Sequence, residues 1–318
     1  MSIVNLTHYD LDGVVCYILL KHLLEDIRYY CCGYGKLEKK VDKIIEDQCI
    51  FNIDTVLVTD MAINVEQSKK LHENFSKIFL FDHHESTELQ IDKLRPYYNN
   101  IYFDKMVCGA SIVYREFKES LQGKLSKEIF DQLTRLVELT DIYDCWRIDH
   151  SDFSLAYYLN SQFWFYNWDM FVARFYNGYT NLSQDELNRA IHQLEVKKKL
   201  VEESDKFVFN KNAILFMSDQ ATEFTNEVTL IERGYQYYFV FTPNEHKLSV
   251  RIRKEGIDLS KTFDKMNREI VKDCGAHPYA GGIQLIPGYS QEQFENLIND
   301  IYNLSEEQLS VNETVSNT

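Results

Sequence analysis

The chain has 318 residues, 45% hydrophobic and 26% charged, which is the composition of a globular protein with room for two domains. Its formal net charge of −15 argues against a duplex DNA-binding protein, and favours a short phosphorylated ligand whose charge divalent cations offset. No apolar run reaches about 18 residues, and acidic residues interrupt the N-terminus, so we expect neither a membrane span nor a signal peptide. Seven cysteines without a CxxC spacing predict reduced thiols and a cytoplasmic protein.

The first half of the chain alternates apolar β-type runs with helical patterns. Strands are predicted at 3–8, 55–60, 77–84 and 101–104, and helices at 13–25, 64–75, 109–121 and 126–140. This alternation predicts an α/β domain over residues 1–150, with a parallel sheet and helices on both of its faces. In such sheets, ligands bind beyond the carboxyl ends of the strands.

The second half changes in character. Residues 151–206 are rich in aromatic and charged helical patterns, and we expect a helical connector there. A smaller α/β domain with a mixed sheet is predicted over 207–304, including a helix near 221–233 and a hairpin that turns at Pro243–Asn244. We interpret the aromatic residues at 157–176 as core packing, with a dimer face or base stacking as alternatives. The polar stretch 305–318 predicts a flexible tail.

Metal-ligand residue types follow three of the predicted strands. They are His8, Asp10 and Asp12, then Asp60, then Asp82, His83 and His84. Carboxylates and imidazoles suit Mn²⁺ or Mg²⁺, with Zn²⁺ or Fe²⁺ as further options, and two such ions can clamp a phosphodiester. We expect Asp60 to bridge two ions, His83 to bind one, and His84 to touch the scissile phosphate. A helix cap at each aspartate and an ordinary core histidine pair are the alternatives, but three successive strand ends favour the metal site.

The segments "HYDLDG", "VTDMA" and "FDHHES" resemble the first three motifs of the DHH phosphoesterases, which are named after the triplet that stands here at 82–84. The resemblance implies a two-metal site formed by His8, Asp10, Asp12, Asp60, His83 and an aspartate of a fourth motif. In "ELTDIYDCW" we favour Asp141 for that position, with Asp144 as the alternative. The aspartate that is not a ligand is expected to cap the helix or to pair with Arg147.

The segments "SVRIRK" and "CGAHPYAGG" resemble the DHH-associated domain, whose glycine-rich segment and arginines hold the nucleotide. The residues that this resemblance assigns to substrate binding are Arg251, Arg253, Gly275, His277, Gly281 and Gly282, together with His84. By the period-two rule, the two arginines should share one face of a strand. The segment "CGAS" matches a further family segment, so we add Ser111, and its backbone N–H groups are candidates to meet a phosphate at a helix N-terminus.

Within the family, the first motif is similar to that of a nano-RNase group, so the resemblance implies a two-metal phosphodiesterase that trims short RNA to mononucleotides. Hydrolysis of cyclic or linear dinucleotides, or of 3′-phosphoadenosine 5′-phosphate, is the alternative. Degradation of long single-stranded DNA is less favoured, because the sequence has no basic track. A non-catalytic nucleotide-binding relative is also less favoured, because no motif aspartate is lost. We expect a short RNA or dinucleotide partner, no duplex DNA, no membrane, and a possible homodimer.

Overall fold

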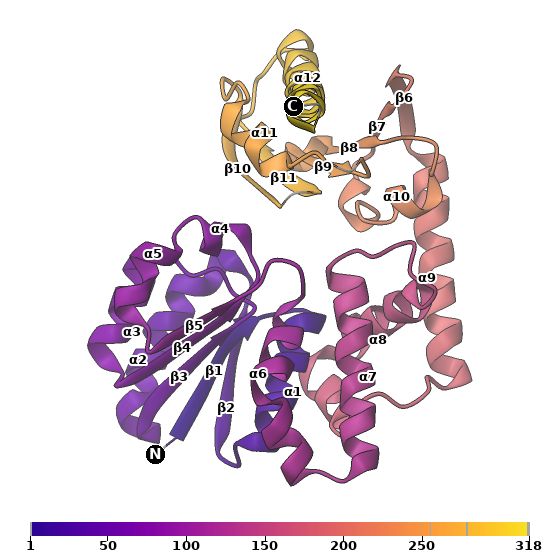
Figure 1. Cartoon of the computed structure of the whole chain (residues 1–318). Helices are drawn as coiled ribbons and strands as arrows, with labels where there is room; N and C mark the ends of the chain where they lie inside the picture. Colours follow the sequence, from indigo (N-terminus) through magenta and orange to yellow (C-terminus); the bar gives the residue numbers. More distant parts are fainter. Residues whose placement is uncertain (1, 255, 278, 317–318) are drawn as a thin grey trace. The chain divides into compact units, whose positions relative to one another are not determined.

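The computed structural model describes residues 2–254, 256–277 and 279–316, with Tyr34, His277 and residues 310–316 described by their backbone alone. The chain forms two compact units, Met1–Ile191 and His192–Thr318. The first unit contains a parallel sheet flanked by helices and the second a mixed sheet, which confirms the predicted α/β class (Figure 1).

The sheet of the first unit has five parallel strands in the order β2-β1-β3-β4-β5. They are β1 (Ser2–His8), β2 (Ile27–Cys32), β3 (Ile53–Thr59), β4 (Lys77–Asp82) and β5 (Asn100–Phe103). Thr7 pairs with Thr59, and Thr59 with Phe81, so β1, β3 and β4 end level with one another. The residues that follow these pairs therefore meet at one edge of the sheet.

Helices cover both faces of this sheet, as predicted. They are α1 (Leu11–Leu23), α2 (Leu37–Phe51), α3 (Val65–Asn74), α4 (Glu85–Glu88), α5 (Ile91–Leu94), α6 (Gly109–Lys124) and α7 (Lys127–Asp144). In Figure 1, α2 and α3 lie on one side of the strands, and α1 and α6 lie together on the other. Helix α1 is buried almost throughout its length, because the sheet, α6, α7 and α8 all pack against it.

The expected connector 151–206 is divided between the two units. Helix α8 (Phe153–Phe175) packs against α1 and α7 within the first unit. Helix α9 (Gln184–Glu203) contains the division between the units. Much of the aromatic content of α8 is core, including Phe163 and Phe171, as we interpreted it from sequence, but Trp164 is exposed.

The second unit has a six-stranded sheet in the order β10-β11-β9-β8-β7-β6, in which only β7 and β8 run parallel. Its strands are β6 (Asp205–Asn210), β7 (Ala213–Met217), β8 (Tyr237–Thr242), β9 (Lys247–Ile252), β10 (Val271–His277) and β11 (Ala280–Leu285). Strands β8 and β9 form the predicted hairpin, which turns at Pro243–Glu245. The helix expected near 221–233 is reduced to a 3₁₀ turn at Ala221–Glu223 and to α10 (Val228–Ile231).

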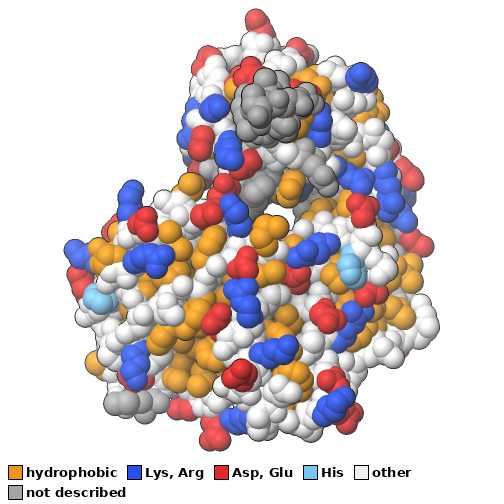
Figure 2. All heavy atoms as spheres, in the orientation of Figure 1, with side chains coloured by type: hydrophobic (Ala, Val, Ile, Leu, Met, Phe, Trp, Pro, Cys, Tyr) orange, Lys and Arg blue, Asp and Glu red, His pale blue; other side chains and the backbone are white. Residues whose placement is uncertain are grey.

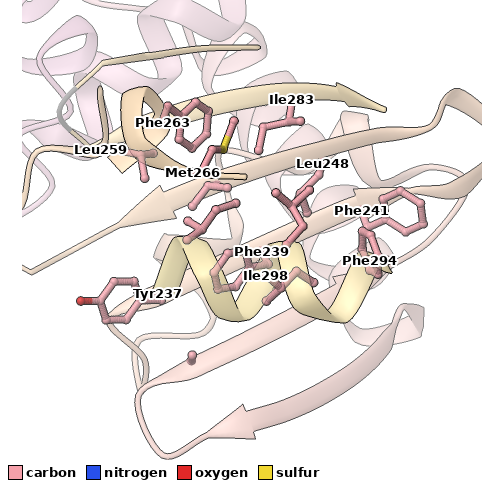
Figure 3. Packing of buried hydrophobic residues seen from close by; sticks show 14 of the residues in the cluster. Tyr237, Phe239, Phe241, Leu248, Leu259, Phe263, Met266, Ile283, Phe294 and Ile298 are labelled. Carbon is pink, nitrogen blue, oxygen red and sulfur yellow. The ribbon is translucent and has the colours of Figure 1, made fainter. Parts of the chain in front are cut away.

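The flexible tail predicted at 305–318 is wrong for the described part of that segment, because α12 (Gln291–Ser316) continues through it. Phe294 and Ile298 of this helix pack on Phe239 and Phe241 of the sheet, and α11 (Leu259–Lys265) also contributes to the core (Figure 3). Farther along α12, the buried Ser305 Oγ lies 3.0 Å from Thr262 Oγ1. Although the sequence of this segment is largely polar, one face of the helix points inward, and its contacts hold the helix against the sheet.

Acidic and basic side chains are interspersed over the face shown in Figure 2, and the described residues there show no continuous basic track. In the part of the chain that the structure describes, every helix is too short or too polar to cross a bilayer.

Candidate active site

Three groups of ligand-type side chains meet at the carboxyl ends of β1, β3 and β4. In each group, one nitrogen or oxygen atom per residue lies within 4.8 Å of those of the others. The groups are His8, Asp10 and Asp60; Asp12, His83 and Asp144; and Asp60, Asp82, His83 and His84. Asp60 and His83 each belong to two groups, so the three form one cluster.

The turn after β1 presents the first two aspartates to different groups. Asp10 is the N-cap of α1, where its Oδ1 accepts a hydrogen bond from Gly13 N at 2.9 Å. Its other oxygen, Oδ2, pairs with His8 Nδ1. Asp12 lies in the first turn of the helix and faces another group. A side chain at residue 13 would meet His8 O at 2.2 Å, so this close turn requires glycine.

Asp12 is held by the N-terminus of α6. Gly109 N donates to its Oδ2 at 2.6 Å and Ala110 N to its Oδ1 at 2.7 Å. A Cβ at residue 109 would lie 2.9 Å from Asp12 Oδ2, so glycine is needed for this approach. The prediction that the N–H groups of this segment meet a phosphate is therefore wrong for these two groups, because a carboxylate of the protein takes that place.

Asp60 follows β3 with a left-handed backbone, φ 49°. Its N–H donates to Phe81 O at 2.9 Å, which joins the end of β3 to β4. Its side chain is buried, and Oδ1 lies 3.2 Å from His83 Nε2. A non-glycine residue in this region of backbone space is uncommon and costs conformational energy, which favours a specific need for the residue here.

Asp82 was not assigned a role from sequence, yet it organises the histidine pair. It is fully buried at the end of β4, where Oδ1 lies 2.7 Å from His84 Nδ1 and Oδ2 accepts a hydrogen bond from Thr87. The contact to Nδ1 orients the His84 ring. The triplet itself was the available signal, because an aspartate two residues before a histidine can fix that ring.

Asp144, rather than the favoured Asp141, joins the cluster, which corrects the sequence-based choice. Asp144 Oδ2 lies 3.6 Å from His83 Nε2. Asp141 instead pairs with Arg147 at 2.7 Å and accepts a hydrogen bond from Cys108 N at 2.9 Å. Ser111 Oγ also donates to Asp141, at 3.4 Å, so the "CGAS" segment is tied to this aspartate.

Burial and neighbouring carboxylates raise the pKa of three of the clustered aspartates, whereas, despite burial, the histidines lower the pKa of Asp10 and Asp82. Burial and the charge of Asp144 raise the pKa of Asp12 to about 7. Burial, followed by the charge of Asp10, raises the pKa of Asp144 to about 6, although His83 opposes this. Burial and the charges of Asp10 and Asp12 raise the pKa of Asp60 well above its usual value. Burial disfavours the imidazolium form of His83, but the charges of Asp144 and Asp12 outweigh it and raise that pKa. The carboxylates of the site therefore outweigh its positive charge.

Divalent cations fit this arrangement. Two buried oxygen atoms, Asp60 Oδ2 and Asp144 Oδ2, accept no hydrogen bond within the described part of the chain. A buried carboxylate oxygen without a donor is costly unless a cation satisfies it. The donor set of oxygens and imidazole nitrogens suits Mn²⁺ or Mg²⁺. The group of His8, Asp10 and Asp60 and the group of Asp12, His83 and Asp144 provide for two ions.

In the second unit, both predicted arginines reach the segment around α10. Arg251 donates to Asn226 Oδ1 at 2.7 Å, and Arg253 donates to Thr229 O at 3.3 Å. Strand β9 ends at Ile252, so Arg253 lies just beyond the strand rather than within it. Because both arginines donate to residues within 226–229, both guanidinium groups nevertheless lie on the same side of the hairpin.

The glycine-rich segment forms the hairpin of β10 and β11. Gly275 pairs directly with Gly282, and a Cβ at either position would meet nothing within 4 Å. Gly281 differs, because a Cβ there would meet Phe263 at 2.6 Å, so packing requires this glycine. His277 belongs to β10, and its side chain lies outside the described residues.

Residues 2–137 match the sequence profile described as "DHH family, N-terminal domain". A curated relative from Helicobacter pylori, named 3′,5′-cyclic-nucleotide phosphodiesterase, is 25% identical over 228 residues. That alignment covers 67% of this chain and 59% of the relative, so the chain spans less than two thirds of that protein.

Two solved structures share the fold over most of the chain. RecJ from Thermus thermophilus in complex with Mn²⁺ has a TM-score of 0.63 and 13% identity, covering 96% of this chain and 52% of RecJ. The pGpG-specific phosphodiesterase PggH from Vibrio cholerae has a TM-score of 0.53 and 14% identity, covering 95% of this chain and 99% of that chain.

Proposed function

We propose, from the match of residues 2–137 to the DHH family profile, that the protein is a metal-dependent phosphodiesterase of short RNA and linear dinucleotides. The observation that carries the proposal is the strand-end cluster, in which Asp60 Oδ2 and Asp144 Oδ2 are buried without a donor. Buried carboxylate oxygens without a hydrogen-bond donor suit divalent cations, and such cations also bind phosphates. The predicted cytoplasmic location is part of the proposal, and the seven free cysteines are compatible with it.

Held by these residues, two divalent cations would supply the activation of water and the stabilisation of negative charge on the phosphate. The protein's own residues have separate tasks. The N-terminus of α6 fixes Asp12, and Asp60 belongs to the group of His8 and Asp10 while lying 3.2 Å from His83 of the other group. Asp82 orients His84, which we propose donates a hydrogen bond or proton to the leaving oxygen. In the second unit, Arg251 and Arg253 are proposed to bind substrate phosphates, with Gly275, His277 and Gly282 along the nucleotide.

The short-substrate proposal is supported by charge. With a net charge of −15, the chain is poorly suited to long polyanions, whose binding depends on many basic contacts. The similarity to PggH, whose name specifies pGpG, favours a linear dinucleotide among the short substrates. The relative from Helicobacter pylori favours a second candidate, a 3′,5′-cyclic mononucleotide.

The test is hydrolysis of labelled RNA of 2 to about 24 nucleotides, pGpG, a cyclic dinucleotide, 3′,5′-cyclic AMP and 3′-phosphoadenosine 5′-phosphate, each with Mn²⁺, Mg²⁺ or EDTA. We expect mononucleotide release to be fastest from the dinucleotides and to stop in EDTA. The variant D60N should be inactive while keeping its circular dichroism spectrum. No hydrolysis of any substrate by the wild type with either metal would refute the proposal, and a preference for cyclic AMP would select the second candidate.

A further inference from the structure

An aromatic surface adjoins the candidate metal cluster in the first unit. We define the aromatic platform as Tyr9 and Trp164, whose exposed fractions are 36% and 59%. Their ring centroids are 6.1 Å apart, with the rings inclined at 64°. Two large aromatic side chains exposed next to each other form an apolar surface that a flat ligand can cover.

Buried rings hold the platform in place. The Tyr9 ring stacks on Trp168 with centroids 6.0 Å apart, and Trp168 is only 3% exposed. Trp168 stacks in turn on Tyr29 at 5.0 Å. Phe163, which is fully buried, contacts the rings of both Tyr9 and Trp164. A platform that is already ordered in this way loses little conformational entropy when a flat ligand binds to it.

A break in α8 separates the two tryptophans that contact Tyr9. Asn167 has φ 61° and ψ −179°, and its side chain accepts a hydrogen bond from Met170 N at 3.4 Å. This backbone conformation is almost confined to glycine and persists only where the surrounding structure holds it. Trp164 therefore lies on one helical segment and Trp168 on the next, with both rings against the same tyrosine.

The chain itself connects this platform to the metal cluster. Tyr9 lies between His8 and Asp10, and both of those residues belong to the group that includes Asp60. Consecutive Cα atoms are about 3.8 Å apart, so the platform begins one residue from the candidate ligands.

We propose that Trp164 stacks on a nucleobase next to the scissile phosphate while the inclined Tyr9 ring contacts the edge of that base, so that Trp164 binds substrate whatever its base. The inference rests on the proposed function. Every nucleobase has a π-face, so stacking tolerates any sequence, as trimming of short RNA requires. It would also supply affinity that an acidic protein cannot obtain from a basic track.

The main test compares W164A with wild type on pApA and on the same dinucleotide lacking both bases, in Mn²⁺. We expect KM for pApA to rise at least about fivefold, with kcat little changed, because stacking contributes to binding. KM for the abasic analogue should stay the same, and W164F should keep most of the affinity. The matched control is F165A, since Phe165 is 52% exposed on the same helix but lies against Arg189 instead of Tyr9.

An unchanged KM for pApA in W164A would overturn the proposal, and so would an equal rise on both substrates. A change in oligomeric state by light scattering, with KM unaltered, would assign the surface to a second copy of the chain and also overturn it. AMP binding separates this proposal from the proposed function. Saturable quenching of tryptophan fluorescence by AMP, lost in W164F, supports the platform even if the wild type hydrolyses nothing, and no quenching in the wild type counts against it.

Discussion

The strand-end cluster of the first unit and the arginine-bearing hairpin of the second unit hold their functional side chains by different means. In the cluster, backbone N–H groups and histidines fix buried carboxylates, and two carboxylate oxygens are left without a donor. In the hairpin, Arg251 lies in β9 and Arg253 just beyond its end, and both donate to oxygen atoms of a neighbouring segment. The first arrangement suits chemistry that tolerates little movement, and the second suits binding that can readjust.

The largest expected effect is on kcat/KM, and it should differ between two aspartates of α7, Asp141 and Asp144. D144N should lower kcat/KM by about a hundredfold to a thousandfold, because it removes a candidate ligand from the charge-stabilising site. D141N is the matched control and should lose about tenfold or less, since Asp141 supports the α6 terminus and Arg147. Steady-state kinetics in Mn²⁺ measures both variants. A greater loss in D141N would mean that Asp141, and not Asp144, belongs to the metal site.

The next largest effect should come from losing the contact by which Asp82 orients His84. D82N keeps the side-chain shape but removes the charge beside His84 Nδ1, so we expect kcat to fall about 10- to 100-fold. The pH–rate profile should also change, because the ring that Asp82 orients is the proposed proton donor. T87V, which removes only the hydroxyl that contacts Asp82, should change kcat much less. Equal losses in the two variants would indicate general disruption of the β4 terminus.

A smaller effect is expected in the second unit. R251K keeps the positive charge but loses the forked geometry that binds phosphate through two hydrogen bonds. KM for a dinucleotide should rise about tenfold while kcat stays within about twofold. K247A, on the exposed start of the same strand, should leave KM unchanged. A fall in kcat without a rise in KM would contradict the division of roles between the two units.

The smallest effect is a pH-dependent change in stability. The folded-state pKa values of Asp12 and Asp144, about 7 and about 6, exceed the usual 3.8, so the EDTA-dialysed folded protein binds more protons than the unfolded chain between these limits. Its stability should therefore fall as pH rises from about 4 to 7. Mn²⁺ should raise Tm by a few °C more at pH 8 than at pH 5, as measured by calorimetry. An equal gain at both pH values, or an undiminished gain in D60N, would contradict the cluster's role.

Much of the first unit could be predicted from sequence, because strand runs and helical periodicity repeat regularly there. Level strand ends then bring His8, Asp60 and His83 together, as the parallel sheet implied. Asp141 and Asp144 could not be separated in this way. Residues three apart lie on one face of a helix, so only the position of Arg147 and the turn after α7 decide which one faces the cluster.

Other errors share a cause, which is that local pattern does not reveal tertiary partners. The N–H groups at the start of α6 looked available for phosphate until Asp12, from 97 residues earlier, was found to accept them. The polar C-terminal segment looked unstructured because its buried positions, such as Ser305, are not strongly apolar. The exposure of Trp164 was likewise invisible in a segment where most aromatic residues are core.

Because the backbone at Asp60 is left-handed, only some substitutions there can test the role of the carboxylate without also changing the backbone. Glycine and asparagine adopt this conformation with little penalty, whereas alanine pays about 1 kcal/mol or more for its Cβ. An alanine variant would therefore confound lost charge with backbone relaxation of the β3 terminus. The same backbone constraint acts in evolution. A homologue that has lost hydrolytic activity but keeps this turn would be expected to have Asn or Gly at the position of Asp60.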